Sequence, residues 1–204
     1  MNKIIKNTGI LMAITLVAGA LLGLVYEVTK TPIAQAQEDA KQEAYRTVLA
    51  DADTFVNEEG FKESKAQKIL NKAGYVSDDI SEVVVGQATS GETVGYVITV
   101  TSHEGYGGDI QISVGIETDG TVKGIEMLSI SETAGLGMKA TEADFKDQFK
   151  DKKVEKFSYT KSGEEGDDKI DALSGATITT NAVTNAVDSA LAYFQEELGG
   201  SVNE

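Results

Sequence analysis

A hydroxyl-rich turn leads into the last segment of helical periodicity in this chain. It reads Asp171-Ala172-Leu173-Ser174-Gly175-Ala176-Thr177, and Thr179 and Thr180 follow it. The start of a helix offers unpaired backbone N–H groups and a partial positive charge, which together favour a phosphate. Gly175 and Ala176 leave space beside that point for a bulky group. Ordinary N-capping uses the same residue types and needs only one Thr, so the turn permits a phosphate site without establishing one.

The composition excludes several classes of protein. With 18 Lys and Arg against 33 Asp and Glu, the net charge is −15, and so acidic a chain should repel nucleic acid. The chain has no Cys, which excludes iron–sulfur clusters, thiolate zinc sites and disulfides. Its one His, His103, makes a multi-His metal site or a Ser-His-Asp triad a poor expectation. Any redox chemistry must therefore come from an organic cofactor.

The N-terminal segment has the length and polarity of a transmembrane helix. No charged side chain occurs from Asn7 to Tyr26, and about 20 apolar residues span a bilayer core. Lys3 and Lys6 precede the segment, which predicts a cytoplasmic N-terminus and an extracytoplasmic main domain. A cleaved signal peptide is the alternative, because Ala34-Gln35-Ala36 resembles a cleavage site. The apolar run exceeds the usual ~7–15 residues of a signal peptide, so we expect a single-pass anchor retained in the cell membrane.

The remaining periodicity predicts an α+β fold, with an antiparallel sheet packed by helices. Pro32 is expected to separate the anchor from a polar helix, and the sheet is expected to bury one face under the final helix. The predicted helices are 34–50, 64–73, 142–149 with Thr141 as N-cap, and 180–198. The first predicted strand begins at residue 83. The others cover 92–102, 109–117, 121–130 and, as an edge strand, 154–159. The expected divisions are the N-terminus and anchor (1–30), a helical linker region (31–80) and a C-terminal domain (81–204).

Three motifs give the chain a resemblance to the FMN-binding domain family. Asp171-x-x-Ser174-Gly175-Ala176-Thr177 matches the family's flavinylation motif at every defining position. Glu104-Gly105-Tyr106-Gly107-Gly108, which precedes a predicted strand, is similar to its Gly-Tyr-Gly-Gly segment. Glu132-Thr133-Ala134-Gly135-Leu136-Gly137 is similar to its Glu-Thr-Pro-Gly-Leu-Gly loop, and Ala134 in place of Pro should make this loop less rigid. The resemblance covers roughly residues 83–198.

The resemblance implies a covalent FMN and the residues around it. Thr177 would carry the FMN through its hydroxyl oxygen, and Asp171 would belong to the signal read by a separate flavin transferase. The other implied residues are Ser174, Gly175 and Ala176 in the tight turn, Glu132, Thr133 and Leu136 against the isoalloxazine ring, Gly135 and Gly137 where backbone approaches it, and Tyr106 and Gly107 nearby. None is expected to be catalytic or to bind a metal. In the plain structural alternative, Leu136 is core, Glu132 a solvated charge and Tyr106 a cap on the sheet.

Within the family, the chain is most similar to the G subunits of Rnf ion-translocating ferredoxin:NAD oxidoreductase complexes. This implies an electron-relay subunit without substrate turnover of its own. Its partners would be the other subunits of a membrane oxidoreductase complex, one of them also flavinylated. The C subunit of the sodium-pumping NADH:quinone reductase is an alternative, although it usually carries extra length.

Two alternatives lie outside electron transfer. An anchored sensor or binding module could use the same domain for flavin or another ligand. A pilin-like assembly protein fits less well, because Lys3, Lys6 and the Gly-rich strand pattern are unlike a packed filament stem. The acidic residues between Glu164 and Asp168 lack the spacing of a calcium-binding EF-hand, so a solvated loop is expected there. We assign no role to His103.

Overall fold

The computed structural model describes residues 2–199, in two compact units that divide between Lys41 and Gln42. A single helix, α1 (Asn2–Val48), makes up the first unit and ends in the second. An 18-residue window of this helix has a mean hydropathy of 2.3, and none of it is buried. The helix is therefore long and apolar enough to cross a membrane once, as a single-pass anchor must be.

Pro32 lies inside α1, so the prediction that it separates two segments was wrong. Proline in a helix interior removes one hydrogen bond and costs about 3 kcal/mol. The residues after it, Ala34-Gln35-Ala36-Gln37-Glu38, are strong helix formers that offset this cost. Ion pairs between Lys30 and Glu27 (2.6 Å) and between Lys41 and Glu38 (3.0 Å) support the helix on both sides of the proline.

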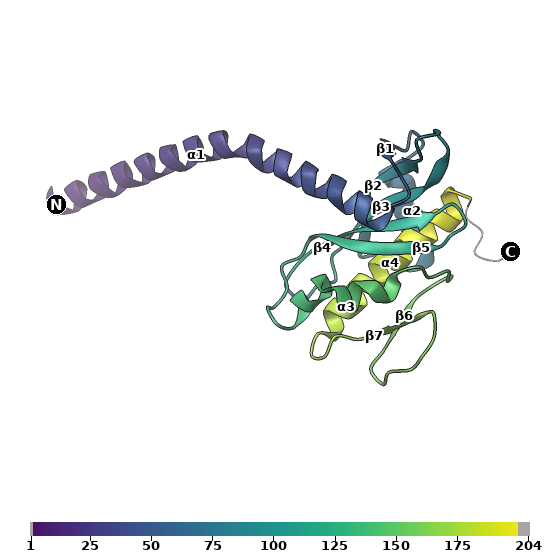
Figure 1. Cartoon of the computed structure of the whole chain (residues 1–204). Coiled ribbons are helices and arrows are strands. Elements are labelled where there is room, and N and C mark those ends of the chain that lie inside the picture. Colours follow the sequence, from purple (N-terminus) through teal and green to yellow (C-terminus); the bar gives the residue numbers. More distant parts are fainter. Residues whose placement is uncertain (1, 200–204) are drawn as a thin grey trace. The chain divides into compact units, whose positions relative to one another are not determined.

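The second unit is built on a five-stranded antiparallel sheet in the order β1-β2-β3-β4-β5 (Figure 1). The strands are β1 (Thr54–Asn57), β2 (Asp78–Gln87), β3 (Thr93–Ser102), β4 (Ile110–Glu117) and β5 (Val122–Ser129). Gly91 and Gly120 form the turns at positive φ, 84° and 90°, which a side chain would disfavour. The predicted meander is therefore confirmed.

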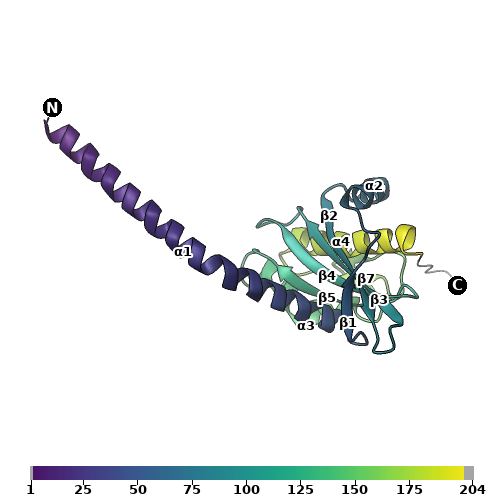
Figure 2. The ribbon, with the colours of Figure 1, turned by 90° about the horizontal axis from the view of Figure 1, so that it is seen from above.

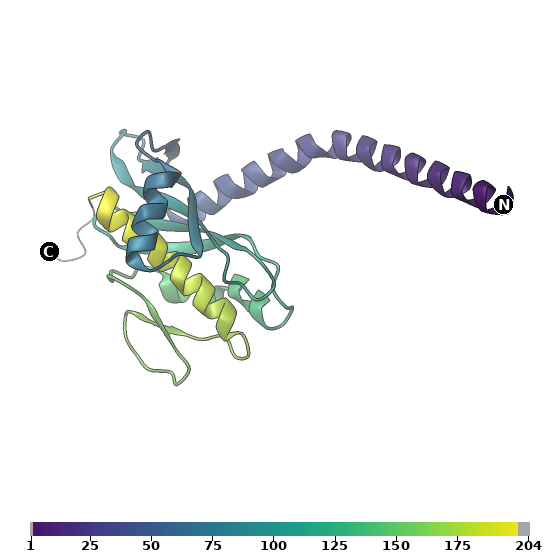
Figure 3. The same ribbon diagram turned by 180° about the vertical axis from the view of Figure 1, so that it is seen from behind.

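Two helices cover one face of this sheet. The C-terminal helix α4 (Thr177–Glu197) crosses β3 and β4, and α2 (Glu63–Ala73) packs beside it and on β2, as Figure 3 shows. The buried residues of this layer include Val183, Val187, Leu191 and Phe194 from α4, Leu70 from α2, and Ile98, Val100, Ile112 and Val114 from the sheet. The predicted apolar stripe of the final helix thus forms the main core.

The opposite face of the sheet is covered as well, so the prediction of one buried face was wrong. Residues 42–48, the end of α1, lie on that side in the view of Figure 2, where α4 lies on the other. Tyr45, Val48, Leu49 and Ala52 form a second buried cluster with Val84 and Val97 of the sheet. Gly115 permits this contact, because a Cβ there would overlap the carbonyl of Val48.

The remaining segments differ from the prediction in two places. The predicted helix 142–149 is instead two short helices, α3 (Ala143–Lys146) and η2 (Asp147–Phe149), and a further short helix, η1 (Gly137–Thr141), precedes them. Thr141 is not the N-cap that was predicted, because its hydroxyl donates to the carbonyl of Met138 (2.9 Å) inside η1. The predicted edge strand is shorter, β6 (Ser158–Thr160), and pairs in parallel with β7 (Lys169–Asp171) in a separate two-stranded sheet.

Candidate functional site

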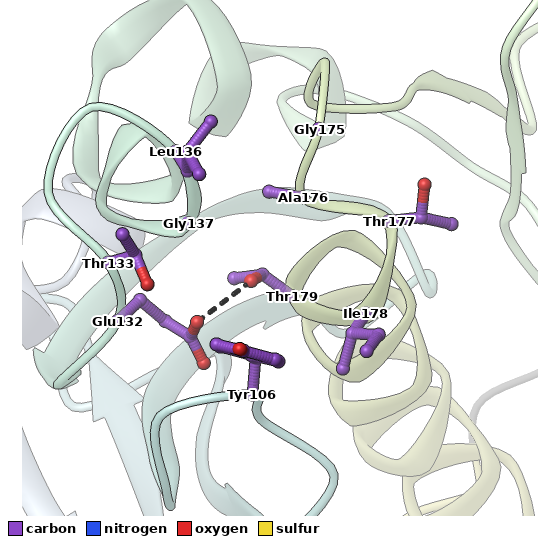
Figure 4. Close-up of a pocket in the computed structure, with 10 residues that line it drawn as sticks. All are labelled: Tyr106, Glu132, Thr133, Leu136, Gly137, Gly175, Ala176, Thr177, Ile178 and Thr179. Atoms are coloured by element: carbon purple, nitrogen blue, oxygen red, sulfur yellow. Dashed lines mark hydrogen bonds between the residues drawn. The ribbon is translucent and has the colours of Figure 1, made fainter.

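Three segments meet around a cavity of about 530 Å³. They are the Gly-rich loop between β3 and β4, the segment that follows β5, and the first turn of α4. Figure 4 shows the residues that line the cavity: Tyr106, Glu132, Thr133, Leu136, Gly137, Gly175, Ala176, Thr177, Ile178 and Thr179. Two antiparallel strands and a helix thus bring together segments that are up to 73 residues apart, from Tyr106 to Thr179.

The first turn of α4 forms one wall. The sequence predicted that this helix begins at residue 180. In the structure it begins at Thr177, so Thr177, Thr179 and Thr180 lie within its first turn and not before it. Within residues 2–199, no side chain caps this end: the N-cap residue is Ala176, and the Thr180 hydroxyl instead donates to the Ala176 carbonyl (3.0 Å). The first amides of a helix have no intrahelical acceptor and carry the positive end of its dipole. This helix start therefore offers free donors to an anion beside the cavity.

The turn before α4 leaves Thr177 accessible from outside the cavity. Gly175 has φ 75°, a left-handed conformation that glycine adopts without strain, and it is exposed. Thr177 is half-buried, and its side chain points away from the Glu132–Thr179 pair in Figure 4. A reagent or an enzyme can therefore approach its hydroxyl from outside the cavity.

Glu132 forms the floor between the three walls. It is 9% exposed, and its carboxylate accepts hydrogen bonds from the backbone N–H of Gly107 (Oε1, 3.1 Å) and from the Thr179 hydroxyl (Oε2, 3.1 Å). Gly137 lies against the same group, since a Cβ there would come within 2.6 Å of Thr179 Oγ1 and 2.7 Å of Glu132 Oε2. Glu132 is thus not the solvated surface charge of the plain alternative.

The rim of the cavity is apolar and open. Tyr106 is 72% exposed, Ile178 53% and Leu136 42%, and each belongs to a different wall. Large apolar side chains exposed around a concave site are typical of a ligand-binding pocket. Leu136 is therefore rim rather than core, and Tyr106 projects at the mouth of the cavity instead of capping the sheet.

The structure brings together eight of the twelve residues that the motifs implied. The other four lie outside the lining: Asp171 at the end of β7, Ser174 in the exposed turn, Gly135 at φ 75° and Gly107, whose amide reaches the cavity only through Glu132. Ile178 and Thr179 were missed. Their position directly after Thr177 was the one available signal, because all three residues belong to the first turn of α4, which forms one wall of the cavity.

A second group of buried acids, Asp188 on α4 and Asp78 on β2, lies away from this cavity. Asp188 accepts hydrogen bonds from the backbone N–H of Phe157 (2.7 Å) and from the Tyr75 hydroxyl (3.3 Å). Burial raises the pKa of Asp188 to about 7, although these bonds and the charge of Lys156 act against the shift. Burial also raises the pKa of Asp78, which accepts from the Ser189 hydroxyl (2.7 Å). These groups bind α4 to the sheet and to the segment before β6.

The cavity fits a flavin nucleotide on its own chemistry. Its apolar rim suits a flat aromatic ring, and its volume lies in the range of about 300–1,000 Å³ that is usual for small-molecule sites. The uncapped start of α4 suits a phosphate, and no acidic residue occurs in its first turn to repel one. The residues present therefore suit both ends of FMN.

Fold and site together define a membrane-anchored protein with an FMN-binding domain. Residues 105–192 match the FMN-binding domain family, and residues 1–48 match the RnfG N-terminal region. The G subunit of the ion-translocating oxidoreductase complex of Methanosarcina acetivorans is 34% identical over 202 residues, which are 97% of this chain and 98% of that protein. The chain belongs to the family of G subunits of ion-translocating oxidoreductase complexes.

A second relative agrees with this assignment, and a solved structure shares the fold. The G subunit of the Na(+)-translocating ferredoxin:NAD(+) oxidoreductase complex of Acetobacterium woodii is 32% identical, over 95% of this chain and 93% of its own length. The crystal structure of the C subunit of the Na(+)-translocating NADH-quinone reductase from Parabacteroides distasonis matches 82% of this chain and 96% of its own, with a TM-score of 0.54 and 20% identity. The latter likeness shows a shared fold alone, so among the two redox alternatives the G-subunit assignment is the one that the relatives support.

Proposed function

We propose that this chain is a membrane-anchored electron-relay subunit of an ion-translocating ferredoxin:NAD oxidoreductase complex, and that it carries FMN covalently on Thr177. The observation that carries the proposal is the uncapped first turn of α4, which begins at Thr177 beside an apolar-rimmed cavity. G-subunit relatives that match nearly the whole chain support the same assignment.

The attachment is a phosphate ester made by the Thr177 hydroxyl. A bond forms between Thr177 Oγ1 and the flavin phosphorus, while the bond from that phosphorus to its leaving group breaks. With a flavin dinucleotide as donor the leaving group is the second mononucleotide, and the hydroxyl proton passes to a base of the transferase. An activated flavin nucleotide, such as a flavin dinucleotide, supplies a good leaving group for this step. A separate flavin transferase is the expected catalyst, and the exposed Asp171 and Ser174 lie where such an enzyme could read them.

The walls of the cavity then bind different parts of the FMN. The first-turn amides of α4 hold the phosphate, while Leu136, Ile178 and Tyr106 border the ring. Bound FMN accepts and donates electrons one or two at a time, and the protein sets its position and surroundings. Because the rim is exposed, the ring edge can face another subunit, and electrons can pass without a bound substrate.

The anchor sets the compartment of this relay. Lys3 and Lys6 on the N-terminal side of the apolar segment support a cytoplasmic N-terminus and an FMN-binding domain on the outer side. The other subunits of the complex are the proposed partners. In that compartment little free flavin is present, and a covalent bond prevents loss of the cofactor.

Intact-mass spectrometry tests the attachment. The chain is co-expressed with a flavin transferase, and we expect an added mass of FMN less one water, with acid-stable yellow colour. Thr177→Val should abolish both, because it keeps the shape of the side chain but lacks the hydroxyl. Thr177→Ser is the matched control that keeps the hydroxyl and should retain flavin. Acid-stable flavin on the Val variant would show that the attachment lies elsewhere.

A further inference from the structure

The Glu132 carboxylate joins the three walls of the cavity at one point. Glu132 itself belongs to the segment after β5, and its two oxygens reach the other two walls. Oε1 accepts from the N–H of Gly107 in the Gly-rich loop, and Oε2 accepts from the hydroxyl of Thr179 in α4, each at 3.1 Å. Both oxygens therefore have donors that belong to other walls.

Packing holds the carboxylate as firmly as its hydrogen bonds do. A Cβ on Gly105 would come within 2.9 Å of Oε1, and one on Gly137 within 2.7 Å of Oε2. These distances are shorter than ordinary van der Waals contact, so the neighbouring backbone already lies against both oxygens. The segments could not come this close around Glu132 if either glycine carried a side chain.

A second glutamate braces the same loop on the same helix. The Glu104 carboxylate accepts from the side-chain amides of Asn185 (2.8 Å) and Asn181 (3.4 Å), one to two turns further along α4. The Gly-rich loop is thus tied to α4 directly by Glu104, before Tyr106, and through Glu132 by Gly107, after it, while the Tyr106 side chain stays 72% exposed. The loop therefore offers a fixed backbone beneath a free aromatic ring.

We propose that Glu132 is a positioning residue that holds the Gly-rich loop and the first turn of α4 at a fixed separation. Thr179 lies two residues after Thr177 in the same helical turn, so its bond to Oε2 fixes the turn that bears the attachment point. The carboxylate acts through Gly107 and Thr179 instead of through its charge on the ring. The part of the inference that concerns the flavin rests on the proposed attachment at Thr177.

Four variants separate positioning from charge. Glu132→Ala removes both bonds, whereas Glu132→Gln removes the charge but keeps one acceptor for Gly107 and an amide that can donate to Thr179. Thr179→Val removes one bond without any change of charge, and Thr179→Ser is its matched control. Positioning predicts that the Ala and Val variants behave alike, and that the Gln and Ser variants behave like the parent protein.

The first readout is the mobility of the attached flavin. In time-resolved fluorescence anisotropy we expect the fast depolarising fraction to rise about twofold or more in Glu132→Ala and Thr179→Val. Glu132→Gln and Thr179→Ser should match the parent, and the midpoint potential of Glu132→Gln should stay unchanged. If Glu132→Gln instead matches Glu132→Ala in both measurements while Thr179→Val is silent, the group acts by its charge and the positioning role is overturned.

The second readout needs no flavin. In hydrogen exchange of the unmodified protein, Glu132→Ala and Thr179→Val should accelerate exchange about tenfold at the hydrogen-bonded amides of Gly107 and Thr180, because each loss of about 1.4 kcal/mol raises local opening tenfold. Unchanged exchange in both variants would overturn the positioning role of Glu132 even if Thr177 carries FMN. Accelerated exchange in a chain that never gains flavin would support the positioning role of Glu132 and would overturn only the proposed attachment of FMN to Thr177.

Discussion

Two buried carboxylates connect helix α4 to its neighbours by the same hydrogen-bond pattern in different surroundings. Glu132 meets the first turn of the helix, and Asp188 lies on the helix further along. Each accepts one backbone N–H and one side-chain hydroxyl, from Gly107 and Thr179 in one case and from Phe157 and Tyr75 in the other. The difference lies in what surrounds them, an open cavity for Glu132 and packed core for Asp188.

This difference separates a site from a structural support. Asp188 is 3% exposed and feels the charge of the nearby Asp78, so burial and that charge favour its protonated form and raise its pKa to about 7. Glu132 lines the cavity that we assign to the flavin. Changes at Asp188 should therefore alter stability and its pH dependence, whereas changes around Glu132 should alter the flavin site.

The largest expected effect is on pH dependence, in Asp188→Asn. The pKa of Asp188 rises from an ordinary 3.8 to about 7 in the folded protein, so between these pH values the folded state holds a proton that the unfolded chain has lost. The free energy of unfolding should thus fall as pH rises from about 4 to about 7, by up to about 1.4 kcal/mol for each pH unit. The amide of the variant cannot titrate and should flatten this fall.

Chemical denaturation of both proteins at pH 4, 5.5, 7 and 8 measures that slope. The parent and the variant share the other acidic residues, so the difference between their slopes isolates residue 188. Equal slopes would show that Asp188 is ionised throughout, and that the two carboxylates do not differ as argued.

Gly137→Ala should disturb the flavin site and leave the pH dependence of the free energy of unfolding unchanged. Its new methyl group would overlap Thr179 Oγ1 and the Glu132 side chain, so we expect a loss of about 1–3 kcal/mol from overpacking. Flavin loading by the transferase should fall several-fold while the pH slope stays that of the parent. Gly91→Ala serves as a control for the cost of substituting a glycine far from the cavity, and it should leave flavin loading unchanged.

Tyr75→Phe tests the support around Asp188 with a smaller change. It removes the 3.3 Å hydrogen bond to Asp188 and should cost about 1 kcal/mol. That bond lowers the pKa of Asp188, so its loss should raise this pKa further and extend the fall in stability to higher pH. Tyr106→Phe, at an exposed position, is the matched control and should leave stability unchanged.

The smallest effect is expected at His103, which precedes the Gly-rich loop. Hydrogen bonds to Asp109 (2.8 Å) and Asp79 (2.9 Å) raise the pKa of His103. The stabilisation is therefore fully present below pH 6.5, the ordinary value, and is lost as pH rises through the folded-state pKa. Because these groups are well exposed, His103→Gln should cost less than about 1 kcal/mol at pH 6 and nothing at pH 9. An effect that grows with pH would contradict this assignment.

The sequence predicted the meander, the stripe of α4 and most of the cavity lining, because each depends on local periodicity or on a short motif. The second covered face of the sheet was missed although Val83-Val84-Val85 is a continuous apolar run, which is typical of a strand buried on both sides. The residues that cover that face, Tyr45 and Val48, lie in the segment 34–50, which was predicted only as a polar helix.

The contacts around Glu132 could not be predicted in the same way. Glu132 and Thr179 are 47 residues apart, and their hydrogen bond exists only because the strands and α4 bring two loops together. The broken helix after Gly137 has the same origin, since this backbone is held close to Glu132 and Thr179 and departs from a regular helix. Pro32 shows the reverse case, in which a local breaking signal was outweighed by the helix formers around it.

The most direct test is fragmentation mass spectrometry of the tryptic peptide that begins at Ile170, from native membranes. No Lys or Arg lies between Lys169 and Glu204, so one tryptic peptide contains Thr177, Thr179 and Thr180. The account predicts an FMN phosphate ester whose fragment ions place it on Thr177. An unmodified peptide from active membranes, or an FMN on another residue, would contradict it.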